Sequence, residues 1–250
     1  MLCLHGFTDT WRSWELVLPM LERHHDVLAP ILPGHAGGPE LGPEASADAL
    51  LDALEQAMDD AGFATAHLVG NSLGGYLALR LAARGRAESV VALAPAGGWA
   101  ADDDSYRTTL DFFTAMQEQL RGIAPHADSI AATAAGRRQA TQFITTNYEH
   151  LPAELVAHLI RGAAGCTAIT PMVEHALRDG WPLDPSLVTC PLRFVWGTDD
   201  RLLPWPAAAA RFTHDWFPHA DWIELHGAGH CPQLDVPLET AQLILGFTRA

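Results

Sequence analysis

Short apolar runs alternate with longer segments of helical periodicity over the first hundred residues of the chain. The runs with the length and composition of buried strands are Leu2–Leu4, Asp26–Ala29, Ala66–Val69 and Ser89–Leu93. The segments between them whose apolar residues recur every three or four positions are Trp14–Arg23, Ala45–Ala61 and Leu73–Ala83. Strands that alternate with helices predict a mainly parallel sheet flanked by helices on both faces.

The rhythm changes between residues 99 and 189, where only helical patterns occur. The segments expected to be helical there are Ser105–Leu120, Arg137–Tyr148, Pro152–Ala163 and Thr170–Arg178. Strands return at Leu192–Trp196 and Trp222–Leu225, and Pro237–Arg249 predicts a closing helix with proline in its first turn. We therefore expect an α/β core made of residues 1–98 and 190–250, with an all-helical cap, or lid, inserted at 99–189.

Composition fits one globular core and excludes several kinds of partner. The chain has 250 residues, of which 48% are hydrophobic, and its formal net charge is −15. A core of this size is large enough for one domain with an insertion. An anionic protein repels phosphate backbones and anionic headgroups, so we expect no nucleic-acid and no membrane partner.

The chain shows no pattern that would carry it into or across a membrane. No apolar run approaches the roughly 20 residues that a spanning helix needs, and the first residues lack the basic and apolar regions of a signal peptide.

Four cysteines, Cys3, Cys166, Cys190 and Cys231, are scattered without a C-x-x-C pair. Free thiols in a reducing cytoplasm are the simplest interpretation.

The segment Gly70-Asn71-Ser72-Leu73-Gly74 has the form G-x-S-x-G and joins a predicted strand to a predicted helix. A serine in such a sharp turn is exposed at the carboxyl end of its strand, where parallel sheets form their sites. The motif alone is also compatible with an ordinary strand–helix turn, because glycine and serine are common. Ser72 is therefore a candidate nucleophile that needs a base and an acid.

Two later segments place the required residue types just after strands. Trp196-Gly197-Thr198-Asp199-Asp200 carries two carboxylates, and His226-Gly227-Ala228-Gly229-His230 ends in a histidine. Their order along the chain, serine, acid and then histidine, is that of the α/β-hydrolase fold. Glycines at 227 and 229 argue against a helix, so His226 and His230 do not form a helical metal pair, and we expect no metal site.

These motifs together resemble the α/β-hydrolase superfamily, in its form with a helical cap, over nearly the whole chain. His5-Gly6-Phe7 is similar to the family's His-Gly turn, and Pro33–Gly38 is similar to the loop after its fourth strand. The family's acid is the third residue after glycine, which selects Asp200 over Asp199. The resemblance implies a triad of Ser72, Asp200 and His230, and an oxyanion hole made by the backbone N–H groups of Phe7 and Leu73.

The activity implied by the resemblance is hydrolysis of a small to medium carboxylic ester through an acyl-enzyme, with no cofactor. Ser72 departs from epoxide hydrolases and haloalkane dehalogenases, which use an aspartate. The loop His5–Asp9 departs from the glycine-rich loop of carbon–carbon hydrolases that cleave ring-fission products. Those hydrolases, lactonases, thioesterases and acyltransferases remain alternatives, as does a non-catalytic ligand-binding homologue.

Several aromatic and sulfur-containing side chains are candidates for the substrate pocket. They are Phe7, Phe112, Phe113, Phe143 and Met172. Packing within the cap is the alternative role for all but Phe7.

The chain also starts later than the family pattern. Family members usually have a β-hairpin before the His-Gly strand, and this sequence begins on that strand, so we expect its sheet to lack the family's first two strands. An unpaired sheet edge would then favour a homodimer and lower stability, and the oxyanion turn would lie close to a chain end.

Overall fold

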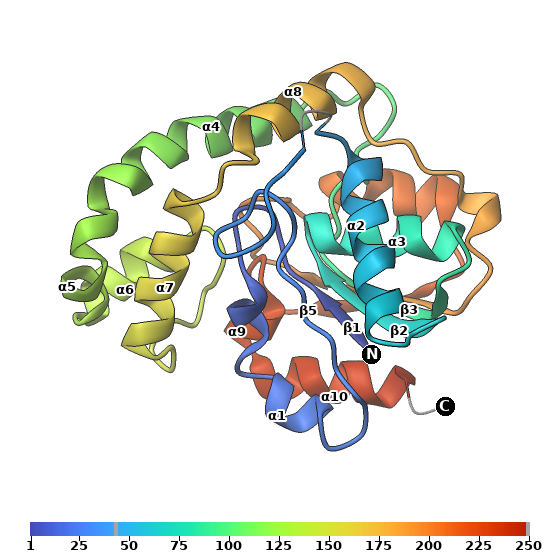
Figure 1. The fold of residues 1–250 in the computed structure, drawn as a ribbon, viewed down its shortest axis with the longest axis horizontal. Helices are drawn as coiled ribbons and strands as arrows, with labels where there is room; N and C mark the ends of the chain where they lie inside the picture. Colours follow the sequence, from blue (N-terminus) through green and yellow to red (C-terminus); the bar gives the residue numbers. More distant parts are fainter. Residues whose placement is uncertain (43–44, 249–250) are drawn as a thin grey trace.

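Five parallel strands form the centre of the protein, whose computed structural model describes residues 1–42 and 45–248 (Figure 1). The strands are β1 (Leu2–Leu4), β2 (Ala66–Asn71), β3 (Ala87–Leu93), β4 (Leu192–Gly197) and β5 (Asp221–Leu225). They lie in the order β1-β2-β3-β4-β5, and every neighbouring pair is parallel. The predicted α/β-hydrolase architecture is confirmed, with each strand within two residues of its expected bounds.

The predicted strand at Asp26–Ala29 is wrong as a strand, but the segment does cover the outer edge of β1. Leu28 forms a single parallel bridge with Leu2. The Cys3 N–H donates to the Leu28 carbonyl at 2.8 Å, and the Leu28 N–H donates to the Met1 carbonyl at 2.9 Å. The hydrogen-bonding groups of β1 on this side are thus partly satisfied, in contrast to the unpaired edge expected from the sequence.

Alternate residues of the strands bury against two different sets of helices. Leu4, Leu68 and Phe194 share one core with α2 (Ala47–Asp60) and α3 (Leu73–Ala83). Their neighbours Cys3, Val69 and Val195 face the opposite core. That second core contains the 3-10 helix η1 (Trp11–Trp14), α1 (Leu18–Leu21) and α10 (Pro237–Thr248). The period of two along each strand therefore produces the two-faced sheet that the sequence predicts.

The predicted helices at the two ends of the chain compare differently with the structure. The segment expected to form one helix at Trp14–Arg23 is divided between η1 and α1, with Pro19 in the first turn of α1. The closing helix begins at Pro237 as expected, and Arg249 lies outside the described residues. Short elements that the pattern did not predict complete the core: η4 (Ala207–Ala209), the π-helix η5 (Phe212–Trp216) and α9 (Pro232–Asp235).

A series of helices occupies the chain between β3 and β4, and we refer to residues 106–179 as the helical segment. Its α-helices are α4 (Tyr106–Ile123), α5 (Ala127–Ala131), α6 (Ala134–Thr141), α7 (Ala153–Ala164) and α8 (Ile169–Asp179). The 3-10 helix η2 (Ala124–His126) joins α4 to α5, and a further 3-10 helix, η3 (Pro185–Leu187), lies between the helical segment and β4. In Figure 1 α4 and α8 lie side by side along the top, and α5, α6 and α7 gather at one end. None of the described helices is long and apolar enough to cross a membrane.

One helix of this segment ends earlier than its periodicity suggests. The pattern predicts a helix at Arg137–Tyr148, but α6 ends at Thr141. Beyond it, the backbone N–H groups of Thr146 and Asn147 donate to the Asp235 carboxylate at 3.0 and 2.6 Å. This carboxylate comes from a part of the chain that local periodicity cannot detect, and it favours a loop over further helix.

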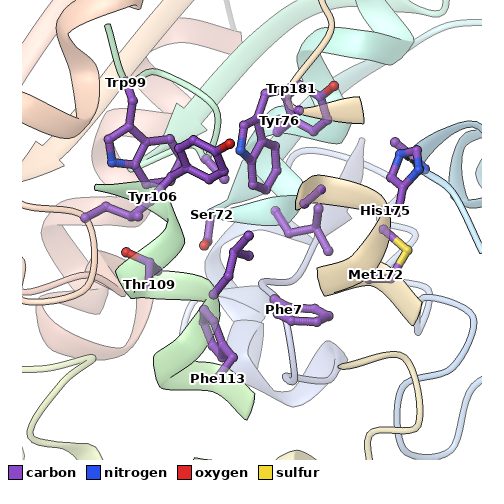
Figure 2. Close-up of a pocket in the computed structure, with 17 residues that line it drawn as sticks. Phe7, Ser72, Tyr76, Trp99, Tyr106, Thr109, Phe113, Met172, His175 and Trp181 are labelled. Carbon is purple, nitrogen blue, oxygen red and sulfur yellow. Dashed lines mark hydrogen bonds between the residues drawn. The ribbon is translucent and has the colours of Figure 1, made fainter. Parts of the chain in front are cut away.

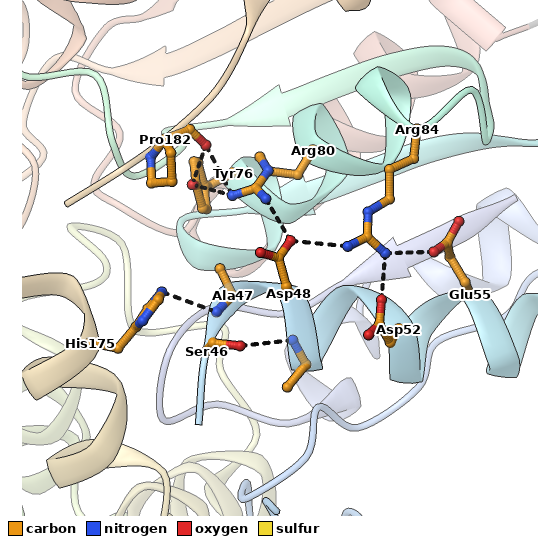
Figure 3. Close-up of polar contacts among 11 residues, drawn as sticks. Ser46, Ala47, Asp48, Asp52, Glu55, Tyr76, Arg80, Arg84, His175 and Pro182 are labelled. Carbon is orange, nitrogen blue, oxygen red and sulfur yellow. Dashed lines mark hydrogen bonds and ion pairs between the residues drawn. The ribbon is translucent and has the colours of Figure 1, made fainter. Parts of the chain in front are cut away.

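Polar contacts on one side of the core hold α2, α3 and α8 together (Figure 3). The Ala47 N–H at the start of α2 donates to His175 Nε2 on α8 at 3.2 Å. Directly after α3, the Arg84 guanidinium lies within 3.0 Å of carboxylate oxygens of Asp48, Asp52 and Glu55, all on α2. A single side chain thus joins three carboxylates of the neighbouring helix.

Replacement of Arg84 by alanine should lower the free energy of unfolding by about 1 kcal/mol, because three partly exposed ion pairs are lost together. The loss should shrink at about 1 M salt, where the screening length falls to about 3 Å. Urea unfolding at two salt concentrations measures both effects. Arg138→Ala, at an exposed position of α6, is the control. An equal loss in both variants, or one that salt does not reduce, would contradict this interpretation.

Candidate active site

Ser72 occupies the junction between β2 and α3 in a conformation that non-glycine residues rarely adopt. Its backbone angles are φ 56° and ψ −118°. The Ser72 N–H donates to the Leu93 carbonyl at 2.9 Å, and the Ser72 carbonyl accepts from the N–H groups of Tyr76 and Ala96 at 3.1 and 3.0 Å. Residues held in such regions cost about 1–3 kcal/mol each and persist only when their surroundings fix them. Here bonds to β3, to the loop after it and to α3 do so.

The glycines around Ser72 are required by close approach of the backbone. A Cβ atom on Gly70 would lie 2.2 Å from the carbonyl oxygen of Gly74. A Cβ atom on Gly74 would lie 2.2 Å from the Leu4 oxygen and 2.6 Å from the His5 oxygen. The first contact is where α3 turns back over β2, and the second is where α3 passes over the end of β1. Both glycines of the motif are therefore required because a larger residue at either position would overlap the backbone.

His230 and Asp200 are brought together by the loops that follow β5 and β4. The His230 Nδ1 lies 2.7 Å from Asp200 Oδ2, and both side chains are buried. Asp200 Oδ1 accepts from the backbone N–H groups of Leu202 and Leu203 at 2.9 and 2.8 Å. Because the carboxylate can only accept, the imidazole proton lies on Nδ1, and Nε2 of the neutral ring keeps its lone pair. Asp199, in contrast, is exposed.

Ser72 and His230 line one cavity of about 740 Å³. No hydrogen bond joins the Ser72 hydroxyl to the imidazole among the described residues. Such bonds are often long in unliganded sites and shorten when a ligand binds. The arrangement thus provides a hydroxyl and an imidazole at one cavity, with a carboxylate behind the imidazole.

The turn His5-Gly6-Phe7 is fixed beside Ser72 by the His5 ring. The Leu32 N–H donates to His5 Nε2 at 3.0 Å, and His5 Nδ1 donates to the Gly6 carbonyl at 2.8 Å. Burial lowers the pKa of His5 to about 3, so the ring is neutral and its tautomer is set. A Cβ atom on Gly6 would lie 3.4 Å from Ser72 Cβ, which places this turn in contact with the serine.

Two backbone N–H groups near Ser72 have no acceptor among the described residues. They belong to Phe7, in the His5-Gly6-Phe7 turn, and to Leu73, the first residue of α3. The first N–H groups of a helix have no partner within the helix and are suited to binding an anion. These are the two groups that the family resemblance assigns to an oxyanion hole.

Sequence reasoning missed Asn71, which connects the serine junction to the histidine loop. Its Nδ2 donates to the carbonyls of Leu93 and His230 at 3.0 and 2.9 Å. Its Oδ1 accepts from Gln233 Nε2 at 3.1 Å and from the Cys231 thiol at 3.2 Å. Asn71 is buried and adjacent to Ser72, and that adjacency was the only sequence signal for its role.

Asp235 is a second residue whose role the sequence did not show. Besides Thr146 and Asn147, its carboxylate accepts from the Gly229 N–H at 2.5 Å. The Cys231 N–H also donates to the carbonyl of Ile144 at 2.8 Å. These bonds fix the loop that carries His230 to the loop that follows α6. The position of the imidazole is therefore tied to the helical segment.

A second, smaller chamber of about 50 Å³ also has Ser72 in its wall (Figure 2). Phe7, Ser72 and Phe113 line both spaces, and the Phe7 and Phe113 rings meet edge to face at 5.1 Å. The other walls of the small chamber are mostly apolar or aromatic and include Trp99, Tyr106, Met172 and Trp181. All five residues expected to line a pocket do line one. Phe112 and Phe143 line the larger chamber and also contact each other at 4.8 Å.

Comparisons with known proteins agree with this fold. A family model described as "Alpha/beta hydrolase family" matches residues 1–243. An epoxide hydrolase, EphH of Mycobacterium tuberculosis (strain ATCC 25618 / H37Rv), is 30% identical over 187 residues, which are 74% of this chain and 87% of that protein. The dihydrolipoyllysine-residue acetyltransferase component of the acetoin cleaving system of Pseudomonas putida is 28% identical over 251 residues, and this chain spans 63% of its length.

Among solved structures, a thermophilic esterase from Thermogutta terrifontis superposes with a TM-score of 0.68. Its sequence is 20% identical, and the match covers 99% of this chain and 88% of the other. At this level of identity the likeness shows the fold.

Gly74→Ala should destabilise the protein by more than about 2 kcal/mol, because the new methyl group overlaps a backbone oxygen that cannot move without shifting β1. Gly122→Ala, in α4, has no atom within 4 Å of the new Cβ and should be neutral or stabilising by up to about 1 kcal/mol. Thermal unfolding of the two variants measures the difference. Equal melting temperatures would show that the crossing at Gly74 is not tight.

Proposed function

The chain belongs to the alpha/beta hydrolase family, and we propose that it is a serine hydrolase of carboxylic esters, with Ser72 as nucleophile, His230 as base and Asp200 as the acid that orients it. The observation that carries the proposal is the 2.7 Å contact between Asp200 and His230 at a cavity that Ser72 also lines. A serine, a base and an orienting carboxylate are the groups that acyl transfer to a hydroxyl needs.

The reaction follows from these groups in two half-reactions. His230 Nε2 takes the Ser72 proton as the hydroxyl oxygen attacks the ester carbonyl, and Asp200 stabilises the imidazolium that forms. The N–H groups of Phe7 and Leu73 donate to the oxyanion, and one such donor is typically worth about 3–4 kcal/mol of transition-state stabilisation. His230 then protonates the leaving alcohol. Water, deprotonated by His230, attacks the acyl-enzyme, and the acid leaves as Ser72 recovers its proton.

Ester hydrolysis is favoured over epoxide opening by the chemistry of a serine nucleophile. A serine that opened an epoxide would become an ether, which water does not cleave under mild conditions. An acyl-serine is an ester and is hydrolysed by the same machinery. The likeness to an epoxide hydrolase therefore supports the family, while the residue at position 72 favours acyl chemistry.

The two chambers give the substrate an orientation. His230 lines the larger chamber and must protonate the leaving alcohol, so the alcohol occupies that chamber. The acyl group then occupies the smaller, apolar chamber, whose volume of about 50 Å³ accommodates about four water-sized groups. A short acyl chain fits this space. The helical segment contributes walls to both chambers, so we assign residues 99–189 the role of a cap.

Ser72→Ala should lower kcat/KM for p-nitrophenyl acetate by about 10³-fold or more, because the nucleophile is lost while the fold is kept. Ser105→Ala, at an exposed position before α4, is the matched control and should retain full activity. Equal rates for wild type and Ser72→Ala would refute a serine mechanism. Turnover of styrene oxide without turnover of esters would instead indicate an epoxide hydrolase.

Met172→Ala should shift the acyl preference toward longer chains, because it removes a side chain from the wall of the small chamber. Wild type should prefer p-nitrophenyl acetate and butyrate to the octanoate. The octanoate-to-acetate ratio of kcat/KM should rise by about tenfold in the variant, equivalent to about 1.4 kcal/mol. Met116→Ala, which changes only the wall of the larger chamber, should leave the ratio unchanged. An unchanged ratio in Met172→Ala would contradict the placement of the acyl group in the small chamber.

A further inference from the structure

Asp9 is the only carboxylate among the described residues that line the larger chamber. It lies two residues after Phe7, and its own N–H donates to the Gly6 carbonyl at 3.2 Å. The Thr10 N–H donates to Asp9 Oδ1 at 2.7 Å. The side chain is half-buried, and the proposed catalysis makes no use of it. The chamber therefore contains an anionic group that is fixed to the same turn as Phe7.

Within the described part of the chain, no cationic side chain of the chamber wall neutralises Asp9. The wall contains no arginine, and His230 is its only basic residue. The whole chain has no lysine, since all 15 of its Lys and Arg residues are arginine. The other polar lining side chains are uncharged and include Gln119, Gln139 and Gln142. The chamber thus has a net negative character whenever His230 is neutral.

Aromatic side chains lie in the same chamber as Asp9. Phe112 and Phe143 contribute to its walls and meet edge to face, and Phe7 lies at the boundary with the small chamber. An alkylammonium group is bound well by a carboxylate together with aromatic faces, because both present negative potential. The net charge of −15 also raises the local concentration of cationic solutes and lowers that of anionic ones.

Building on the proposed function, we propose that Asp9 determines specificity for the leaving group, so that the preferred substrates are short-chain esters of alcohols that carry an alkylammonium cation. The ester carbonyl lies at Ser72, the acyl chain in the small chamber and the cationic alcohol beside Asp9. Esters with an anionic alcohol are disfavoured in the same chamber.

The charge state of Asp9 fits this role at neutral and alkaline pH. Burial raises the pKa of Asp9 to about 6, and hydrogen bonds from Thr10 and Ser13 and the nearby His230 oppose the rise. The carboxyl is therefore mainly ionised at pH 8 and becomes protonated as the pH falls through about 6. The other titratable group against it is the Cys231 thiol, whose pKa burial raises well above its usual value, so it adds no charge.

Two isosteric acetates test the inference directly. Acetylcholine and 3,3-dimethylbutyl acetate differ only in the exchange of a quaternary nitrogen for carbon. At pH 8 wild type should show kcat/KM for the cationic ester about tenfold above that for the neutral one, a preference of about 1.4 kcal/mol. In Asp9→Asn, which retains an acceptor for the Thr10 N–H, the preference should disappear while kcat/KM for the neutral ester stays within about threefold of wild type.

The control for net charge is Asp111→Asn, at an exposed position of α4 outside the chamber, which should keep the preference. Equal kcat/KM values for the two esters in wild type, or a preference that survives in Asp9→Asn, would overturn the inference. So would hydrolysis of p-nitrophenyl acetate without hydrolysis of either acetate. Ser72→Ala separates the two claims, since activity that survives it contradicts the proposed serine mechanism and leaves the role of Asp9 unaffected.

Discussion

The close crossing of backbone at Gly70 and Gly74 is the constraint on which the rest of the site depends. Because glycine has no Cβ atom, the backbone at both positions can approach its neighbours closely enough for α3 to start directly over the ends of β1 and β2. A Cβ atom would overlap a backbone oxygen at either position. The same crossing forces Ser72 to a φ of 56°, which three backbone hydrogen bonds maintain. The hydroxyl is therefore presented at the carboxyl end of the sheet, where parallel α/β folds form their sites.

Long-range hydrogen bonds then place the other groups relative to Ser72. Asn71 joins the serine junction to the carbonyl of His230, and Asp235 joins the loop of that histidine to the helical segment. His5 fixes the turn that carries Phe7. Each connection uses a backbone group, and all but the bond from Thr146 are buried, so the helical segment and the imidazole are joined by a short series of hydrogen bonds. In our account, substrate fit and positioning of the base are therefore coupled.

The sequence predicted what local pattern and motif spacing can encode. The strand–helix alternation and the bounds of α3 were correct because they depend on nearby residues. The pairing of Asp200 with His230 was implied by the family resemblance, in which the acid is the third residue after glycine, and the structure places them 2.7 Å apart. The strand at 26–29 and the part of the predicted helix after residue 141 were wrong, because partners from distant parts of the chain, Leu2 and Asp235, bond to those segments. The division of the cavity into two chambers had no sequence signal, since it depends on the contact between Phe7 and Phe113.

The most direct test of the central claim, that the junction presents Ser72 as a nucleophile activated by His230, is labelling with a fluorophosphonate followed by peptide mass spectrometry. Our account predicts one adduct, on Ser72, and a labelling rate that falls by about 10³-fold or more in a folded His230→Ala variant. An adduct on another residue, or equally rapid labelling of Ser72 without His230, would contradict it.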